Sequence, residues 1–354
     1  MEDTRHNSRL MQASIQAIEY HLPADVVSNQ DLAAEFPEWT VDKIEGKTGI
    51  AERHVVCADE CASDLAEAAA RKLFGGACQP EDIDYLLLCT QSPDHFLPTT
   101  ACILQDRLGI PTHAGALDFN LGCSGFIYGL GLAQGLIQSD QAAKVLLITA
   151  ETYSKFIHPK DKSVRTIFGD AAAATLITAA TEPQNLKSAY VFGTDGRGAG
   201  NLIVPAGGLR RRSSPATAEA VSDENGNWRS PDNLYMNGGE IFNFTLDAIP
   251  QSVSRLLARS GKQLQDVDLF VFHQANRYML DYLRKKLKIP QEKFYIWLSS
   301  CGNTVSSTIP IALKHAVQDG RLNTGQLVML VGFGVGYSWG ATLIQWPALG
   351  YPVL

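Results

Sequence analysis

The sequence lacks a surplus of basic residues. Its 354 residues include 30 Lys and Arg against 37 Asp and Glu, which leaves a net charge of −7. Because proteins bind nucleic acids by neutralising phosphates, this balance argues against a nucleic-acid partner. An acidic partner would have to be bound through a local basic patch.

A targeting signal and a long apolar run are also missing. Residues 1–7 are polar and charged, unlike the start of a secretory signal peptide. The longest apolar stretch, residues 126–138, is short and glycine-rich for a membrane span, so a buried core helix is the better interpretation. We therefore expect a cytoplasmic protein without a membrane segment.

The seven cysteines form no CxxC pair and no ligand spacing that includes a nearby His. An odd number of cysteines without the spacing of a disulfide framework favours reduced thiols over disulfides. The spacing also gives no indication of a metal site. The 45% hydrophobic content is ordinary for a globular protein, and the length suffices for one large or two medium cores.

The most informative stretch surrounds Cys123. Residues 115–119 predict a short buried strand, residues 120–125 a glycine-flanked turn, and residues 126–138 a helix. This geometry sets a cysteine at a helix N-terminus, where unpaired N–H groups and the helix dipole favour the thiolate. The alternative is a structural cysteine, since free Cys is among the most buried residue types.

Several segments recur in the same order at an offset of roughly 180 residues, far too long for a solenoid repeat. The matching pairs are residues 82–90 and 266–274, residues 144–148 and 326–330, and the turns at Cys123 and Asn303. Three matches at a nearly constant offset predict two similar α/β halves, residues 1–180 and 185–354. Each half should hold a mixed or parallel sheet flanked by helices.

Duplication has a consequence for function. If the halves pack about a pseudo-twofold axis, the turns after equivalent strands converge. These turns carry Cys123, His273 and Asn303, which supply a thiol, an imidazole and a carboxamide. Each has an ordinary structural explanation as a buried thiol, a core histidine or a turn residue. Their coincidence at matching positions favours a shared site.

Other elements of the first half follow from local patterns. Residues 14–22 and 85–89 predict strands, and residues 64–74 predict a helix. Asn29 is placed to cap a helix, and residues 42–53 are expected to form a solvated loop.

The sequence resembles a β-ketoacyl-acyl-carrier-protein synthase III, a condensing enzyme of the thiolase superfamily, over essentially its whole length. The stretches that carry the resemblance, specific in their order and spacing, are residues 47–54, 122–126, 168–173, 273–276, 302–304 and 332–340. The resemblance implies a homodimer with a thiolase-like fold, in which two duplicated α/β halves form a five-layer αβαβα sandwich.

The resemblance also implies a decarboxylative Claisen condensation without a metal or redox cofactor. Cys123 would take a starter acyl group from acyl-CoA or acyl carrier protein, and malonyl-acyl-carrier protein would then lose CO2 and attack it. His273 Nε2 and Asn303 Nδ2 would stabilise the enolate, and the backbone N–H groups of Cys123 and Val335 the other oxyanion. Initiation of fatty-acid synthesis is the default pathway, and a specialised secondary-metabolite or surface-glycan pathway would use the same residues.

Further positions match substrate-binding positions of the family. They are Leu97, Phe168, Gly238, Phe242, Ala275, Asn276, Phe333, Lys47 and Lys162. Two departures from the family pattern concern the substrate. Lys43 and Lys47 replace a Trp and an Arg that commonly contact the CoA adenine. Leu97 replaces a phenylalanine that commonly reaches the acyl pocket from the partner subunit and gates it. Leu97 motivates the hypothesis of a starter other than acetyl.

A basic patch follows the histidine motif. Arg277, Arg284 and Lys285 lie on a helix expected over residues 277–287. A charged helix face is commonly just solvated, but acyl carrier proteins are acidic, so the resemblance favours this patch as their docking site. Residues 207–232, rich in Gly, Ser and Pro, predict an exposed loop that could cover the entrance.

Four alternatives differ in the residues they require. A thiolase would place a second cysteine in residues 332–340, and a hydroxymethylglutaryl-CoA synthase would need a glutamate where residues 92–95 offer only Asp94. A thiolase-fold acyltransferase often alters the asparagine that Asn303 retains. A non-catalytic partner subunit would be expected to lose one of the three catalytic residues.

Overall fold

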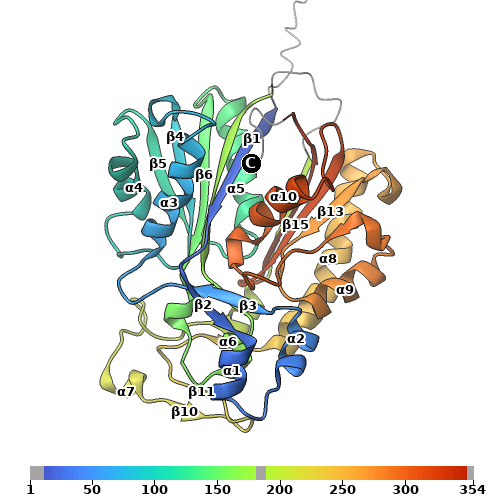
Figure 1. Cartoon of the computed structure of the whole chain (residues 1–354). Coiled ribbons are helices and arrows are strands. Elements are labelled where there is room, and N and C mark those ends of the chain that lie inside the picture. Colours follow the sequence, from blue (N-terminus) through green and yellow to red (C-terminus); the bar gives the residue numbers. More distant parts are fainter. Residues whose placement is uncertain (1–11, 181–188, 349–354) are drawn as a thin grey trace, which may run out of the picture.

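Two five-stranded mixed sheets face each other in the computed structural model, which describes residues 12–180 and 189–348 (Figure 1). The first sheet has the order β1 (Ala13–His21), β7 (Ala171–Ala179), β6 (Lys144–Glu151), β4 (Tyr85–Cys89), β5 (Gly115–Phe119). The second has the order β8 (Ala189–Thr194), β16 (Ser338–Gln345), β15 (Leu327–Gly334), β13 (Leu269–Phe272), β14 (Phe294–Tyr295).

Strand directions match between the sheets. β4 runs parallel to β5 and β6, and β13 runs parallel to β14 and β15. β7 is antiparallel to both its neighbours, as is β16 in the second sheet. The central strands are apolar and almost wholly buried because helices cover both faces. This agreement in order and direction is what a duplicated α/β half predicts.

Six helices complete the five layers. α5 (Gly125–Gln138) and α10 (Thr308–Gln318) lie between the sheets, α3 (Ala62–Phe74) and α4 (Thr100–Leu108) cover the outer face of the first, and α8 (Gly238–Ser260) and α9 (Arg277–Lys286) cover that of the second (Figure 1). The middle layer is apolar on nearly all sides because it packs against both sheets. α5 therefore presents few polar residues.

A smaller region lies at one end of the sheets (Figure 1). Its elements are β2 (Asp25–Ser28), α1 (Asn29–Glu35), α2 (Val41–Thr48), β3 (Glu52–Val55), α6 (Lys162–Arg165), α7 (Pro215–Ala218), β10 (Val221–Ser222) and β11 (Trp228–Arg229). Short 3-10 turns include η2 (Tyr153–Phe156), which follows β6, and η6 (Val305–Ser307), which precedes α10 and contacts β6 and β7. The short strands β9 (Leu202–Ile203) and β12 (Tyr235–Met236) pair with each other. The segment 207–232 is thus partly structured, although residues 207–216 are all exposed.

The expected cap at Asn29 is wrong. Ser28 is the N-cap of α1, since its hydroxyl oxygen accepts a hydrogen bond from the Asp31 N–H at 3.2 Å. Asn29 is instead buried at the first helical position, and its Nδ2 donates to the Ile50 carbonyl at 2.7 Å. Sequence reasoning chose the wrong one of two neighbouring residues that both favour caps.

The expected loop over residues 42–53 is also wrong. Most of it forms α2 and β3, and Arg53 is only 1% exposed. Its guanidinium donates to the Thr166 carbonyl at 3.0 Å and to the Asn29 side chain at 3.0 Å. The residues adjacent to Arg53 in the sequence do not show that its guanidinium is buried against neutral oxygens, so the sequence alone predicts a solvated charge.

The other predicted elements are confirmed, with shifts of one or two residues at their ends. They are the strands β1, β4 and β5 and the helices α3, α5 and α9. All seven cysteines are free thiols, as expected. Among the helices of the described ranges, none combines the length and apolarity needed to cross a bilayer.

Candidate active site

Cys123 lies in the turn between β5 and α5, two residues before the helix begins. Its side chain is buried beneath β15 of the opposite sheet. A Cβ added to Gly334 would lie 2.7 Å from the Cys123 Sγ, and one added to Gly332 would lie 2.8 Å from the Cys123 carbonyl oxygen. Only glycine lets β15 pass this close to the thiol.

Burial raises the pKa of the Cys123 thiol to about 12. The backbone N–H groups of Val335 and Cys123 bond to the sulfur and act in the opposite direction, while the carboxyl of Glu151 adds to the increase. The net pKa shift is opposite to the one expected from a helix N-terminus, because desolvation by both sheets outweighs the local donors. At neutral pH the Cys123 side chain is therefore a neutral thiol.

His273 follows β13 and is only 2% exposed. Burial lowers the pKa of its imidazole to about 3, so the ring is neutral at physiological pH and carries one N–H. Its Nδ1 lies 2.7 Å from the Thr308 Oγ1, and the edge of the ring meets Phe333 at a centroid distance of 5.6 Å. These contacts restrain the ring in one plane.

Asn303 is held at both its backbone and its side chain. Its N–H donates to the Ile167 carbonyl at 2.9 Å, and its carbonyl accepts from the Gly169 N–H at 3.1 Å. Together these two bonds form a parallel β-bridge between Asn303 and Phe168. The Asn303 Oδ1 accepts from the Val305 N–H at 2.9 Å. Because an N–H must face an acceptor, this bond fixes the amide orientation and directs Nδ2 away from Val305.

Val305 lies where the three turns meet. Its N–H orients Asn303, and its carbonyl oxygen lies 3.1 Å from the Thr308 hydroxyl, which itself contacts His273 Nδ1. A Cβ added to Gly122, the neighbour of Cys123, would lie 3.2 Å from the Val305 Cγ1. The structure thus brings together the three residues that the repeat predicted to converge. Val305 has φ +54°, an uncommon value for a β-branched residue.

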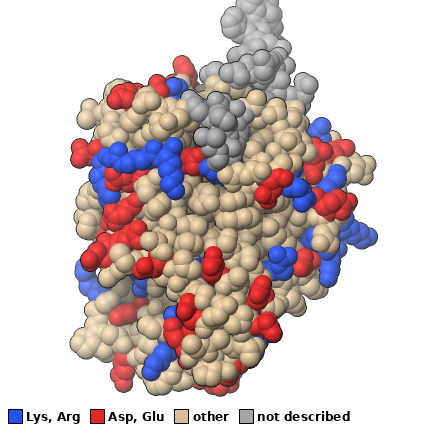
Figure 2. Space-filling view, in the orientation of Figure 1, with Lys and Arg blue, Asp and Glu red and all other residues tan. Residues whose placement is uncertain are grey.

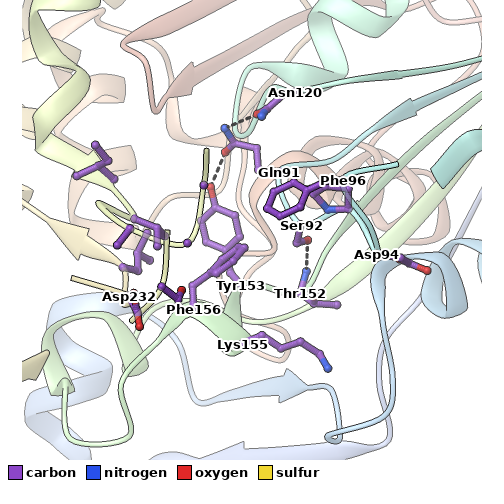
Figure 3. Close-up of a pocket in the computed structure, with 18 of the residues that line it drawn as sticks. Gln91, Ser92, Asp94, Phe96, Asn120, Thr152, Tyr153, Lys155, Phe156 and Asp232 are labelled. Carbon is purple, nitrogen blue, oxygen red and sulfur yellow. Dashed lines mark hydrogen bonds between the residues drawn. The ribbon is translucent and has the colours of Figure 1, made fainter. Parts of the chain in front are cut away.

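A cavity of about 930 Å³ opens beside this centre (Figure 3). Val335 is one of the residues that line it. The apolar lining of the cavity includes Phe96, Tyr153, Phe156, Leu202, Val204 and Leu234. One wall carries a hydrogen-bonded row, in which the Tyr153 hydroxyl donates to Gln91 Oε1 at 2.5 Å and Gln91 Nε2 donates to Asn120 Oδ1 at 3.0 Å. A largely apolar cavity that reaches Val335, whose N–H faces the Cys123 sulfur, suits an acyl chain.

Leu97 lies outside this cavity within the single chain, although its neighbour Phe96 lines it. The Leu97 side chain is 86% exposed. Gly207, Gly208 and Ser213 also border the cavity, so the exposed segment expected to cover the entrance does reach it.

Lys43 and Lys47, which replace the Trp and Arg that commonly contact the CoA adenine, lie in the smaller region. Lys47 Nζ lies 5.3 Å from the centroid of the Trp39 ring, and Lys43 Nζ lies 5.0 Å from the same ring. Lys162 forms an ion pair with Glu38. Trp39 therefore offers an aromatic ring to both lysines, four residues before the position where the family pattern expects a Trp.

The remaining expected substrate contacts lie along α8 and α9. Gly238 is exposed at the start of α8, and Phe242 packs on the rings of Tyr278 and Tyr282. Asn276 is the N-cap of α9, because its Oδ1 accepts from the Met279 N–H at 2.9 Å. This structural role was not expected.

The next residue of that motif is fixed by backbone contacts. The N–H of Ala275 donates to the His273 carbonyl at 2.9 Å, and Ala275 is nearly buried.

The predicted docking patch is only partly available. Arg277 and Lys285 are exposed, but the Arg284 side chain is only 16% exposed. Its Nη1 donates to the Ile289 carbonyl at 3.2 Å, so Arg284 serves the C-terminal end of its own helix and is removed from the patch. On the face shown in Figure 2, acidic and basic side chains are interspersed.

Sequence reasoning missed four residues that shape the site. Gln91, Glu151, Val305 and Thr308 all make buried or partly buried hydrogen bonds around it. Glu151 alone had a signal in the sequence, since it is an acidic residue at the end of a strand whose residues 145–148 are all apolar. No group of three His, Cys, Asp or Glu side chains suited to a metal ion occurs among the described residues.

Comparisons with known proteins agree with this geometry. Two family models match the chain: 3-oxoacyl-[acyl-carrier-protein (ACP)] synthase III over residues 117–196, and the C-terminal part of the same family over residues 257–346. The β-ketoacyl-[acyl-carrier-protein] synthase III of Clostridium perfringens is 39% identical over 326 residues, which cover 92% of this chain and 96% of that protein. The corresponding protein of Methylococcus capsulatus is 38% identical over 330 residues, with the same two coverages, 92% and 96%.

Solved structures show the same relationship. A crystal structure of a 3-oxoacyl-(acyl-carrier-protein) synthase III is 53% identical, with a TM-score of 0.93, and the match covers 95% of this chain and all of that one. The 3-oxoacyl-(acyl-carrier protein) synthase of Burkholderia xenovorans LB400 is 37% identical, with a TM-score of 0.87 and coverages of 96% and 95%. The chain therefore belongs to the β-ketoacyl-acyl-carrier-protein synthase III family of thiolase-fold condensing acyltransferases.

Proposed function

We propose that this chain performs the condensation that initiates fatty-acid synthesis, with Cys123, His273 and Asn303 as its catalytic residues. A starter acyl thioester and malonyl-acyl-carrier protein would give 3-oxoacyl-acyl-carrier protein, CO2 and a free thiol. The observation that carries the proposal is the orientation of Asn303. Its Oδ1 is occupied by the Val305 N–H, so its Nδ2 is available as a donor beside a neutral histidine.

In the first half-reaction, the Cys123 sulfur attacks the thioester carbonyl of the starter. The N–H groups of Cys123 and Val335, which already bond to the sulfur, are suited to hold the oxyanion that forms. The acyl–sulfur bond of the donor breaks, and its thiolate leaves with the proton from Cys123. The thiol thus needs no separately bound base.

In the second half-reaction, the malonyl carboxylate leaves as CO2, and negative charge develops on the thioester oxygen. His273 Nε2 and Asn303 Nδ2 donate hydrogen bonds to this enolate oxygen. The proposal places the single ring proton on Nε2, so the Thr308 hydroxyl, 2.7 Å from Nδ1, donates to that nitrogen instead of to the Val305 carbonyl 3.1 Å away. The enolate carbon then attacks the acyl group, and the Cys123 thiolate leaves and is reprotonated.

The remaining features of the proposal concern partners and organisation. The acyl cavity holds the starter, and Leu97 of a second copy replaces the bulkier gate of other family members, which favours a starter larger than acetyl. Arg277 and Lys285 bind the acidic carrier protein. The enzyme is a cytoplasmic homodimer without a metal or redox cofactor, and residues 1–180 and 185–354 are its two halves.

Intact-protein mass spectrometry tests this function. The protein is incubated with a panel of acyl-CoA and acyl-carrier-protein donors, with Cys123→Ser as the control, and malonyl-acyl-carrier protein is then added. We expect a discrete mass gain on the wild type alone, and its loss as 3-oxoacyl-carrier protein appears. Loading that malonyl-carrier protein never discharges would contradict condensation, and acetyl loading far faster than all longer donors would contradict the larger starter.

A further inference from the structure

Glu151 is a carboxyl buried close to the site, with no assigned part in the reaction. It ends β6, and its side chain is fully buried. It forms no ion pair among the described residues, and its hydrogen-bond partners are neutral groups. A buried carboxyl without a cation is costly to keep ionised, so its position calls for an explanation.

One set of its contacts belongs to the loop that follows β4. The Gln91 N–H donates to Glu151 Oε2 at 3.1 Å, and the Ser92 hydroxyl donates to the same oxygen at 3.2 Å. Gln91 is the residue whose side chain joins Tyr153 and Asn120 in the cavity wall (Figure 3). Glu151 thereby anchors the base of that wall.

The other contact crosses to the second half of the chain. The Ser306 hydroxyl donates to Glu151 Oε1 at 3.1 Å. Ser306 follows Val305, whose N–H orients the Asn303 amide. One carboxyl therefore joins the loop that shapes the acyl cavity to the loop that aims a catalytic donor.

We propose that Glu151 is a positioning residue, which ties the cavity wall to the Asn303 loop and sets the charge beside Cys123. The inference deepens the proposed function by adding a residue that acts through Gln91, Ser306 and Cys123 without touching substrate.

The electrostatics of the cluster agree with this role. Burial raises the pKa of the Glu151 carboxyl to about 8, with a further contribution from Asp170. The titratable groups that face it are Cys89 on β4, Cys123, Tyr153 and Asp170, and none is a cation. At neutral pH the carboxyl keeps its proton, for which the Ser92 or Ser306 hydroxyl then acts as hydrogen-bond acceptor, and above about pH 8 it places a negative charge beside Cys123.

The alkylation rate of Cys123 as a function of pH tests the electrostatic part. Iodoacetamide labelling is resolved by peptide mass spectrometry, because exposed Cys57 and Cys102 also react. In Glu151→Gln, the rate should rise about tenfold per pH unit from about pH 6.5 to about pH 9.5, since thiolate remains the minor species. In the wild type, the plot of alkylation rate against pH should become less steep above about pH 8. At about pH 9.5 the wild-type rate should be about three- to tenfold lower than that of the variant. Superimposable profiles would overturn the inference.

Two neighbouring serines test the positioning part and serve if Glu151→Gln does not fold. Ser306→Ala removes the bond to Glu151, whereas Ser307→Ala removes an equally buried hydroxyl that bonds Thr149. We expect Ser306→Ala to slow malonyl-acyl-carrier-protein decarboxylation about tenfold, as misplacement of one donor does, while Ser307→Ala does not. Equal losses, or none in either variant, would contradict the role. Alkylation requires no acyl donor, so its outcome is independent of whether the condensing function is correct.

Discussion

At Cys123, desolvation and hydrogen bonding act in opposite directions on the same sulfur. Burial raises the pKa of the thiol to about 12, whereas the N–H groups of Val335 and Cys123 favour the anion. In the proposed mechanism, those donors contribute most when negative charge moves from sulfur to the thioester oxygen during attack. Under that proposal, the site is better matched to the tetrahedral intermediate than to a resting thiolate.

Asn303→Asp should separate the two half-reactions. The aspartate can still accept from the Val305 N–H, but it presents a carboxylate oxygen where the enolate needs a donor. We expect malonyl-carrier-protein decarboxylation to fall by about 10²- to 10³-fold, as for loss of an oxyanion-hole donor. Acyl loading on Cys123 should stay within a few-fold of wild type. An equal loss of loading, measured by mass spectrometry, would show that Asn303 is structural.

The low pKa of His273 makes a second prediction at this scale. A group whose pKa falls from 6.5 to about 3 stays neutral well below pH 6, so its N–H donor is unchanged across the usual assay range. Decarboxylation by the Cys123→Ala variant, which isolates this step, should show no inflection between about pH 5 and about pH 7. An inflection near pH 6.5 that His273→Gln removes would mean that the imidazole titrates normally and that burial is relieved by substrate.

At the scale of elements, the sequence predicts best what depends on local pattern. The apolar runs of β4 and β13 and the turn before α5 can be predicted, because each depends on neighbours along the chain. The pKa of Cys123 cannot be predicted in this way, because β15, more than 200 residues away, supplies much of its burial. The buried environments of Arg53 and Glu151 could not be predicted for the same reason, since their hydrogen-bond partners come from distant segments.

Helix α9 carries a prediction about the carrier protein. Arg277→Glu with Lys285→Glu should raise the KM for malonyl-acyl-carrier protein roughly three- to tenfold and leave kcat nearly unchanged, because exposed charges act on encounter. Lys262→Glu, a reversal just past the end of α8, is the control and should have no effect. The test is steady-state kinetics at low and moderate salt. A KM that changes neither with the double substitution nor with salt would place the docking site elsewhere.

At the scale of the molecule, the two sheets share an arrangement but differ at one edge. β5 pairs with β4 alone among the described strands, and Leu117 at its centre is 41% exposed. The equivalent edge strand of the second sheet, β14, is only two residues long and fully buried. An open edge with an exposed apolar centre is a template for pairing with another strand. We therefore expect the proposed homodimer to form through this edge of the first half.

Twofold pairing through β5 makes a sharp prediction about assembly. In an antiparallel pair centred on a five-residue strand, Leu117 lies opposite its own copy, so one substitution places two like charges face to face. Leu117→Lys and Leu117→Glu should each sediment as monomers, whereas an equimolar mixture should recover a dimer because the opposed charges then attract. Val221→Lys, an exposed apolar position on β10, should leave the wild-type dimer intact. Dimers that persist in both single variants would place the interface away from β5, and a monomeric wild type would exclude the dimer itself.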